Sequence, residues 1–181
     1  MYGLYIHIPY CVSKCRYCDF VSAPGTREEQ ERYITAVIRE MELYRGEPVD
    51  TVFFGGGTPT ALSPELLERL LSAVCKNFCM SEDVEFSVEA NPKTLNREKL
   101  SVMRAYGVNR LSIGVQSFQD RELKWLGRAH SAKDAETTVA LAREYFDNIN
   151  LDIMTAIPEQ TVSSLTDTLK TAISFFPAHL S

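Results

Sequence analysis

The sequence lacks the features that would place the chain in a membrane, on a secretory route or on a nucleic acid. None of its apolar runs approaches the roughly 20 residues that a membrane-spanning helix needs. The N-terminus enters the apolar segment 4–8 without a basic region or a small-residue cleavage site, which argues against a signal peptide. The net charge is −5, whereas a broad nucleic-acid footprint is basic. We therefore expect a cytoplasmic protein that binds no nucleic acid.

Cysteine is too scarce and too unevenly placed for a disulfide framework. There are five cysteines, an odd count, and Cys11, Cys15 and Cys18 are clustered. This pattern fits a reducing compartment. The other two, Cys75 and Cys79, lie four residues apart in a helical pattern. We expect them to be packed or surface thiols, because free cysteine behaves as a small hydrophobic residue.

The three clustered cysteines give the strongest indication of chemistry. Thiolates at such close spacing suit a soft metal. A structural zinc ion needs four ligands, and the cysteine loop offers no fourth Cys or His. An iron–sulfur cube is usually held by four cysteines, so three would leave one iron open for reaction. A zinc site completed by a distant ligand and a reduced trio without metal are the alternatives.

Apolar strand patterns alternate with amphipathic helical patterns along the chain. Strands are expected at residues 4–8, 51–54, 84–90, 110–115 and 149–154, and helices at 27–44, 64–78, 97–106, 120–126, 133–146 and 163–176. Residues 179–181 open a sixth strand. This alternation predicts parallel βαβ units in one α/β domain, 1–181. We expect a partial (β/α)6 TIM-like barrel, truncated at the start of its sixth strand; a doubly wound open sheet is the alternative.

Polar residues follow these strands at the end where a barrel gathers its site. The glycine run 55–57 lets the backbone approach a ligand closely, although a plain turn is the simpler interpretation. Glu89 ends the third strand, Gln116 follows the fourth and Asp152 lies in the fifth. Arg128 offers a bidentate fork that suits a carboxylate. A solvated strand end is the simpler alternative for Glu89 alone, and a surface position is the simpler alternative for Arg128 alone. Together the polar residues at successive strand ends predict one ring.

Two histidines and the single tryptophan carry weaker expectations. His7 is expected to be a hydrogen-bonded core residue, and Trp125 is expected to pack. His130 is a candidate functional residue because it lies near Arg128, although no metal-ligand spacing supports it.

Seven motifs in a fixed order carry a resemblance to a known family. They are Tyr5-Ile-His-Ile-Pro9, Cys11-x3-Cys-x2-Cys-Asp19-Phe20, Phe53-Phe-Gly-Gly-Gly-Thr-Pro59, Glu89-Ala-Asn-Pro92, Ser112-Ile-Gly-Val-Gln-Ser-Phe118, Leu126-Gly-Arg-x-His130 and Asn150-Leu-Asp152. The cysteine spacing resembles the signature of the radical S-adenosylmethionine (SAM) superfamily. Together the motifs resemble the oxygen-independent coproporphyrinogen III oxidase family and its heme-chaperone branch, over nearly the whole chain.

The resemblance implies a radical SAM core with two cofactors. It implies that Cys11, Cys15 and Cys18 hold a [4Fe-4S] cluster whose open iron binds SAM. It also implies that the SAM site is lined by Tyr5, Tyr17, Gly56, Gly57, Thr58, Glu89, Gln116, Arg128 and Asp152. The glycine run resembles the GGE-type motif that holds the SAM amino group. From donor and acceptor type we assign Arg128 to the methionine carboxylate, and Asp152 with Gln116 to the ribose.

Two activities within this family compete. The oxidases carry a further Cys two residues after the third cluster Cys, whereas Phe20 stands there in this chain, as in the heme-chaperone branch. We therefore expect a heme chaperone that binds heme and passes it to an acceptor protein at the membrane surface. A flavodoxin or ferredoxin is the expected electron donor. Oxidative decarboxylation of the porphyrinogen is the alternative, so whether the protein is an enzyme stays open, and a metal-stabilised interaction module is a third interpretation.

The resemblance also carries expectations about the end of the chain. Family members continue beyond it with the end of the barrel and a C-terminal domain, so heme ligands are expected outside these residues. We also expect residues 163–176 to be loosely held, with Phe175 and Phe176 exposed.

Overall fold

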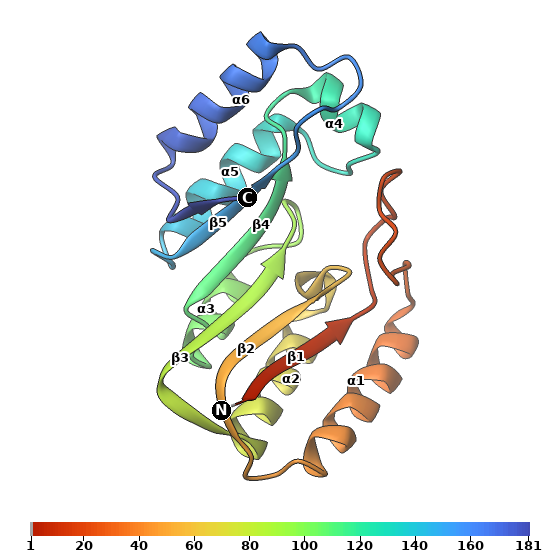
Figure 1. The fold of residues 1–181 in the computed structure, drawn as a ribbon. Helices are drawn as coiled ribbons and strands as arrows, with labels where there is room; N and C mark the ends of the chain where they lie inside the picture. The colour runs from red at the N-terminus through yellow and green to blue at the C-terminus, as the bar shows by residue number, and fades with distance from the viewer. Residues whose placement is uncertain (1) are drawn as a thin grey trace.

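The computed structural model describes residues 2–181, and strands and helices alternate along them (Figure 1). The strands are β1 (Tyr2–Ile8), β2 (Pro48–Gly56), β3 (Cys79–Ala90), β4 (Arg110–Gln116), β5 (Ile149–Ile153) and β6 (His179–Leu180). The helices are α1 (Arg27–Glu42), α2 (Pro64–Asn77), α3 (Arg97–Ala105), α4 (Asp120–Leu126), α5 (Ala132–Arg143) and α6 (Val162–Ser174), with the short 3-10 helix η1 (Pro59–Ala61) after β2. The predicted elements are confirmed in number, type and order.

The six strands form one parallel sheet in the order of the chain, from β1 to β6. A doubly wound sheet reverses its strand order at a switch point, and this sheet does not. The sheet is curved and open, as Figure 1 shows. The expected partial (β/α)6 barrel is therefore confirmed, and the doubly wound alternative is wrong.

The core lies between the helices and the convex face of the sheet. Along β1 the burial alternates, because successive strand residues point to opposite faces: Ile6 and Ile8 are buried, whereas Tyr5 is 55% exposed. Phe54 and Phe86 pack edge to face across neighbouring strands, with ring centroids 5.3 Å apart. The concave face therefore carries the polar and aromatic side chains that the helices do not cover.

Side-chain caps explain where the helices begin. Thr26, Ser131 and Thr161 each form a capping box, in which the cap hydroxyl accepts a backbone N–H and the N3 side chain accepts the cap's own N–H. Ser63 caps α2 with Pro64 at the first helical position. Gly127 ends α4 in the left-handed conformation, at φ 72°.

One local expectation is wrong. Cys75 lies in α2, but Cys79 does not continue that helix, because α2 ends at Asn77 and the extended residue Phe78 leads directly into β3. Cys79 instead pairs with Pro48 of β2. Both thiols are exposed, as expected of residues outside a core metal site.

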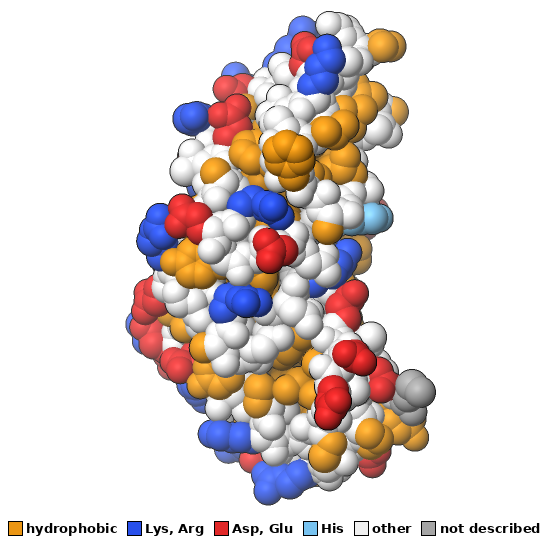
Figure 2. Space-filling model, turned by 90° about the vertical axis from the view of Figure 1, so that its left-hand side faces the viewer, with side chains coloured by type: hydrophobic (Ala, Val, Ile, Leu, Met, Phe, Trp, Pro, Cys, Tyr) orange, Lys and Arg blue, Asp and Glu red, His pale blue; other side chains and the backbone are white. Residues whose placement is uncertain are grey.

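The surface carries charges of both signs. Figure 2 shows Lys and Arg side chains interspersed with Asp and Glu side chains over one face of the molecule. No helix among residues 2–181 combines the length and the apolar character that crossing a bilayer requires.

The last helix buries few of its side chains. Only Thr168 and Ala172 of α6 are buried, whereas seven residues of α2 are. Phe176 is 80% exposed, as expected. The expectation for Phe175 is wrong, since its ring stacks on Phe118 with centroids 6.0 Å apart.

We predict that amide exchange is faster in α6 than in the central strands, because local opening exposes less apolar surface where few side chains are buried. Hydrogen–deuterium exchange measured by mass spectrometry should show residues 165–173 exchanging well before residues 52–54. Equally slow exchange in the two segments would contradict the prediction.

Candidate cofactor-binding site

A cavity of about 170 Å³ opens where the cysteine loop crosses the C-terminal ends of the strands. All three clustered cysteines and seven of the nine residues predicted to bind SAM line it. These residues are Cys11, Cys15, Cys18, Tyr17, Gly56, Gly57, Glu89, Gln116, Arg128 and Asp152. The sequence therefore predicted most of the residues that line this cavity.

Two predicted residues lie elsewhere. Thr58 is 1% exposed and supports the wall from behind, where its hydroxyl lies 3.5 Å from the Cys11 sulfur and accepts from Asn91 Nδ2 at 2.7 Å. Tyr5 stands on the concave face, with its ring stacked on Phe53 and its hydroxyl 3.1 Å from His7 Nδ1. Thr58 therefore supports the cavity wall through Cys11 and Asn91, whereas Tyr5 lies outside the cavity lining.

Backbone hydrogen bonds fix the cysteine loop at both of its ends. Cys11 N–H donates to the Ala23 carbonyl, and Ala23 N–H donates to the Pro9 carbonyl. Farther along the loop, Arg16 N–H donates to the Leu126 carbonyl at the end of α4. The cysteines are thus held over the strand ends by segments far apart in the sequence.

The glycine run packs against this loop. Gly57 N–H donates to the Ile8 carbonyl at 2.8 Å, and Thr58 N–H donates to the Tyr10 carbonyl at 2.7 Å. A Cβ atom on Gly57 would lie 2.7 Å from the Tyr10 carbonyl oxygen, so only glycine fits. Gly56 has φ 108° and donates its N–H to Glu89 Oε2 at 3.2 Å. The run is therefore a close backbone contact between the loop and the sheet, at the point where the chain leaves β2.

Arg128 joins the cysteine loop to the strand ends. Its Nη1 donates to the Cys15 sulfur at 3.4 Å and to the Tyr17 hydroxyl at 3.3 Å. Its Nη2 donates to Asn91 Oδ1 and to the Gly114 carbonyl. Its Nε is buried and has no partner among the described residues. An unpaired buried donor costs about 1–3 kcal/mol, so this atom indicates a ligand or water at the site.

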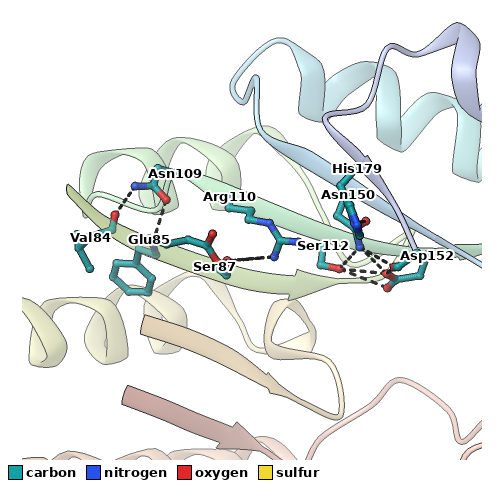
Figure 3. Close-up of polar contacts among 11 residues, drawn as sticks. Val84, Glu85, Ser87, Asn109, Arg110, Ser112, Asn150, Asp152 and His179 are labelled. Atoms are coloured by element: carbon teal, nitrogen blue, oxygen red, sulfur yellow. Dashed lines mark hydrogen bonds and ion pairs between the residues drawn. The ribbon is translucent and has the colours of Figure 1, made fainter. Parts of the chain in front are cut away.

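Asp152 is held in place by a polar network on the concave face (Figure 3). Its Oδ1 accepts from Asn150 Nδ2 at 2.6 Å, from Ser181 Oγ at 2.7 Å and from Ser112 Oγ at 3.2 Å. His179 Nδ1 lies 2.6 Å from Asn150 Oδ1. Three strands thus orient one carboxylate at the cavity wall.

Several residues of the site were missed or left without a role by sequence reasoning. Asn91, Ser112 and Gly114 line the cavity, and Asn150 positions Asp152. Their only indication in the sequence is that each stands within one of the seven motifs. A Cβ atom on Gly114 would lie 2.6 Å from Asn91 Oδ1, so this glycine makes room for the side chain that Arg128 contacts.

Burial changes the charge state of two groups in the cavity wall. It raises the pKa of Glu89 to about 7; the nearby Asp152 adds to this rise, and the Gly56 N–H and His7 oppose it. It also raises the pKa of Tyr17 to about 12, although Arg128 acts in the opposite direction. Tyr17 is therefore a neutral phenol at neutral pH, and Glu89 keeps a proton to higher pH than an exposed carboxyl group does.

The remaining candidates have these positions. His130 is 5% exposed, its Nε2 lies 3.2 Å from the Val115 carbonyl, and burial with the nearby Arg128 lowers its pKa to about 4. It lines a second cavity, of about 210 Å³, behind the Arg128 wall. His7 is half-buried and hydrogen-bonded to the Val21 carbonyl. Trp125, which was expected to pack, is 42% exposed.

Residues 5–172 match the family model described as the radical SAM superfamily. The chain belongs to the radical SAM superfamily. It is 43% identical to the heme chaperone HemW of Bacillus subtilis over 187 residues, a match that covers 100% of this chain and 49% of that protein. It is 39% identical to HemW of Escherichia coli, covering 99% of this chain and 49% of that protein. The chain thus spans about half the length of the curated relatives it matches.

A solved structure supports the same assignment. Coproporphyrinogen III oxidase (HemN) from Escherichia coli, described as a radical SAM enzyme, is 32% identical and superposes with a TM-score of 0.90. The match covers 99% of this chain and 43% of that one. Membership of the radical SAM superfamily implies a [4Fe-4S] cluster and SAM as cofactors.

The donor chemistry of the cavity fits these cofactors. Three free thiols are soft ligands of the type that iron–sulfur clusters take. Within residues 2–181, no three Cys, His, Asp or Glu side chains converge on a point that a single ion could occupy. A cube takes one thiolate at each corner iron, so its ligands need not converge in that way. Arg128, whose Nη1 donates to the Cys15 sulfur, adds a cationic side chain beside the thiols.

We predict that Glu89→Gln stabilises the protein in alkaline solution. The folded-state pKa of Glu89, about 7, lies above its ordinary value of 4.5, so the contribution of this group to stability is present below pH 4.5 and is lost as the pH rises through 7. Glutamine cannot ionise and avoids that loss. Urea denaturation should show a free energy of unfolding about 2 kcal/mol higher for the variant at pH 8, and little difference at pH 4.5.

Glu82→Gln is the control for this prediction, because Glu82 lies on the same strand, is exposed and is in none of the ion pairs among residues 2–181. The difference in free energy of unfolding between this control variant and wild type should be the same at pH 8 and at pH 4.5. An equal effect of Glu89→Gln at both pH values would contradict the prediction.

Proposed function

We propose that this chain is the cofactor-binding core of a heme chaperone, which binds heme and passes it to an acceptor protein. The observation that carries the proposal is that Cys11, Cys15 and Cys18 share one cavity with the polar strand ends. The heme chaperones of two bacteria, 43% and 39% identical, support the finer assignment. Phe20, which replaces the further Cys of the oxidases, lines the same cavity and is 66% exposed.

Cys11, Cys15 and Cys18 would hold the cluster, and three thiolate ligands would leave one iron for SAM. When bound, the cluster and SAM supply one-electron chemistry, and the protein binds, orients and shields them. Cys11 is braced by Thr58, and Cys15 accepts a hydrogen bond from Arg128, which stabilises a thiolate. These contacts pre-form the cluster site.

The SAM contacts follow from the donors and acceptors that the cavity presents. An ammonium group needs acceptors, and Glu89 with the carbonyls of Gly56 and Gly57 can supply them, because the N–H groups of both glycines are already donated. A cation there favours the ionised form of Glu89. Asp152 is pre-oriented as an acceptor for the ribose hydroxyls, with Gln116 beside it.

Arg128 and Tyr17 are assigned to the methionine carboxylate. Arg128 already has four acceptors, so its fork is not free as the sequence suggested, and the unpaired Nε is its remaining donor. The neutral Tyr17 phenol offers a second donor at the same wall. Thr58 supports the wall through Cys11 and Asn91.

The proposed partners are an electron donor such as flavodoxin or ferredoxin, and a heme acceptor at the membrane surface; the proposed compartment is the cytoplasm. The tip of the cysteine loop supports a docking role, because Val12, Phe20 and Val21 are each at least 65% exposed beside the cluster cavity.

Heme titration of the full-length protein tests the chaperone assignment. We expect a saturable shift of the heme Soret absorbance, and its absence would overturn the assignment.

The competing oxidase activity is favoured by the superposition on HemN, at a TM-score of 0.90. It requires decarboxylation of coproporphyrinogen III under strict anoxia with SAM and a reductant, and we expect no product.

A further inference from the structure

Glu122 of α4 is a buried carboxylate without a cationic partner. It is 4% exposed, and none of the ion pairs among residues 2–181 includes it. A buried charge must be compensated by hydrogen bonds, and three neutral side chains provide them. Ser117 Oγ donates to Oε2 at 2.6 Å, Gln160 Nε2 donates to the same oxygen at 3.1 Å, and Ser164 Oγ donates to Oε1 at 2.7 Å.

These three donors come from separate parts of the chain. Ser117 directly follows β4, Gln160 lies in the connection from β5 to α6, and Ser164 is in the first turn of α6. Figure 1 shows this connection beside α4. Thr168, one turn farther along α6, accepts the Phe118 N–H at 3.3 Å. The carboxylate therefore ties the end of β4 to the start of α6.

The residue before Ser117 has an unusual backbone. Gln116 has φ 68°, a left-handed conformation that costs about 1–3 kcal/mol in a residue with a side chain and persists only where its neighbours fix it. Its side chain lines the cofactor cavity. Its carbonyl accepts the Met154 N–H at 2.9 Å, which fixes one side of the turn. Ser117 is fully buried, and its hydrogen bond to Glu122 fixes the other side of the turn.

We propose that Glu122 is a positioning residue for the cofactor cavity. By fixing Ser117 it holds Gln116 in the left-handed conformation that directs the Gln116 side chain to the cavity wall. Through its hydrogen bonds with Gln160 and Ser164, Glu122 also links the position of α6 to that wall. The effect of Glu122 on SAM binding rests on the proposed function, whereas its effect on the backbone conformation of Gln116 does not.

The first experiment measures SAM binding to the cluster-reconstituted chain by isothermal titration calorimetry. Glu122→Ala removes the acceptor that Ser117, Gln160 and Ser164 share and should raise the Kd for SAM about 10-fold, the scale of one lost hydrogen bond. Glu122→Gln should stay within about 2-fold of wild type, because serine hydroxyls can accept as well as donate. Ser117→Ala removes the hydroxyl that donates to Glu122, together with its contacts to the Gln119 N–H and the Thr168 hydroxyl. It should raise the Kd for SAM as Glu122→Ala does, and it replaces Glu122→Ala as the test where that variant folds poorly.

A double-variant cycle separates positioning from general stability. If Glu122 acts through Gln116, the double variant Glu122→Ala/Gln116→Ala should bind SAM no more weakly than Gln116→Ala alone. Its free energy of unfolding should nevertheless fall below that of Gln116→Ala. Effects on Kd that multiply in the double variant would overturn the proposal.

The second experiment needs no SAM. Amide exchange at Met154, followed by NMR, should be at least about 10-fold faster in Glu122→Ala than in wild type, because the carbonyl that accepts its N–H is released. Arg121→Ala is the matched control: Arg121 pairs at the surface with Glu159, joining the same helix to the same connection. Arg121→Ala should leave the exchange rate at Met154 and the Kd for SAM unchanged.

Unchanged exchange at Met154 in Glu122→Ala would overturn the positioning role, whatever happens with SAM. Wild-type protein that binds no SAM would instead overturn the proposed function, and the exchange result would still decide the role of Glu122.

Discussion

Anaerobic reconstitution of a Cys15→Ala variant with iron and sulfide is expected to leave a nearly colourless protein with little iron, whereas wild type should turn brown and take up about four irons per chain. The three thiols line one cavity and can each reach one corner of a cube. Two remaining thiolates cannot hold the cube firmly. Cys11→Ala and Cys18→Ala should give the same result by iron and sulfide analysis.

The matched controls are Cys75→Ala and Cys79→Ala. Both thiols are exposed, and Cys75 lies in α2 with its sulfur 3.6 Å from the Tyr106 carbonyl, away from the cavity. Each control should retain the full iron content and the visible spectrum of wild type. Loss of the cluster from Cys75→Ala would show that the three-cysteine ligand set is wrong.

Gly57→Ala is expected to cause the largest loss from a single methyl group. The added Cβ would lie 2.7 Å from the Tyr10 carbonyl oxygen and 2.9 Å from the Ile8 carbonyl oxygen, both backbone atoms that cannot rotate away. The glycine run would have to separate from the cysteine loop. We expect the free energy of unfolding to fall by about 3 kcal/mol, as overpacking in a tight site does, and iron uptake to fall with it.

Gly3→Ala is the control for the added methyl group. Its Cβ would meet only the Thr51 hydroxyl, which can rotate, at 2.9 Å. Urea denaturation should show a change of less than about 1 kcal/mol, and iron uptake should be unchanged. Similar losses in the two variants would contradict the role given to Gly57.

The order of the elements was predictable because it depends on local patterns. Apolar periodicity located the strands and helices, and Ser63 with Pro64 marked the start of α2. The early start of β3 was not predictable in this way. Cys79 N–H donates to the Glu47 carbonyl and Gly46 N–H donates to the Asn77 carbonyl, and such pairing between distant segments leaves no trace in a local period.

The site was predictable to the extent that it depends on strand ends. Parallel strands end at one edge of a sheet, so Glu89, Gln116 and Asp152 were expected to meet, and they do. The position of Tyr5 was not predictable from its motif. It precedes the end of β1 by three residues, which places it about 10 Å down the concave face.

Glu122 gave no indication in the sequence. A glutamate in the first turn of a short helix is typical of a solvated surface charge. Its partners Gln160 and Ser164 come from a segment about 40 residues away, so only the folded structure reveals that the carboxylate is buried.

The most direct test of the three-thiolate site is the electron paramagnetic resonance spectrum of the reduced, fully loaded cluster, recorded with and without SAM. Three cysteine ligands leave one iron open, and SAM bound there changes the ligand field of the cluster. We predict that adding SAM shifts the g values of the reduced signal, and that Cys75→Ala shows the same shift. A spectrum that is indifferent to SAM, from protein carrying its full iron content, would contradict an open iron that binds SAM in this cavity.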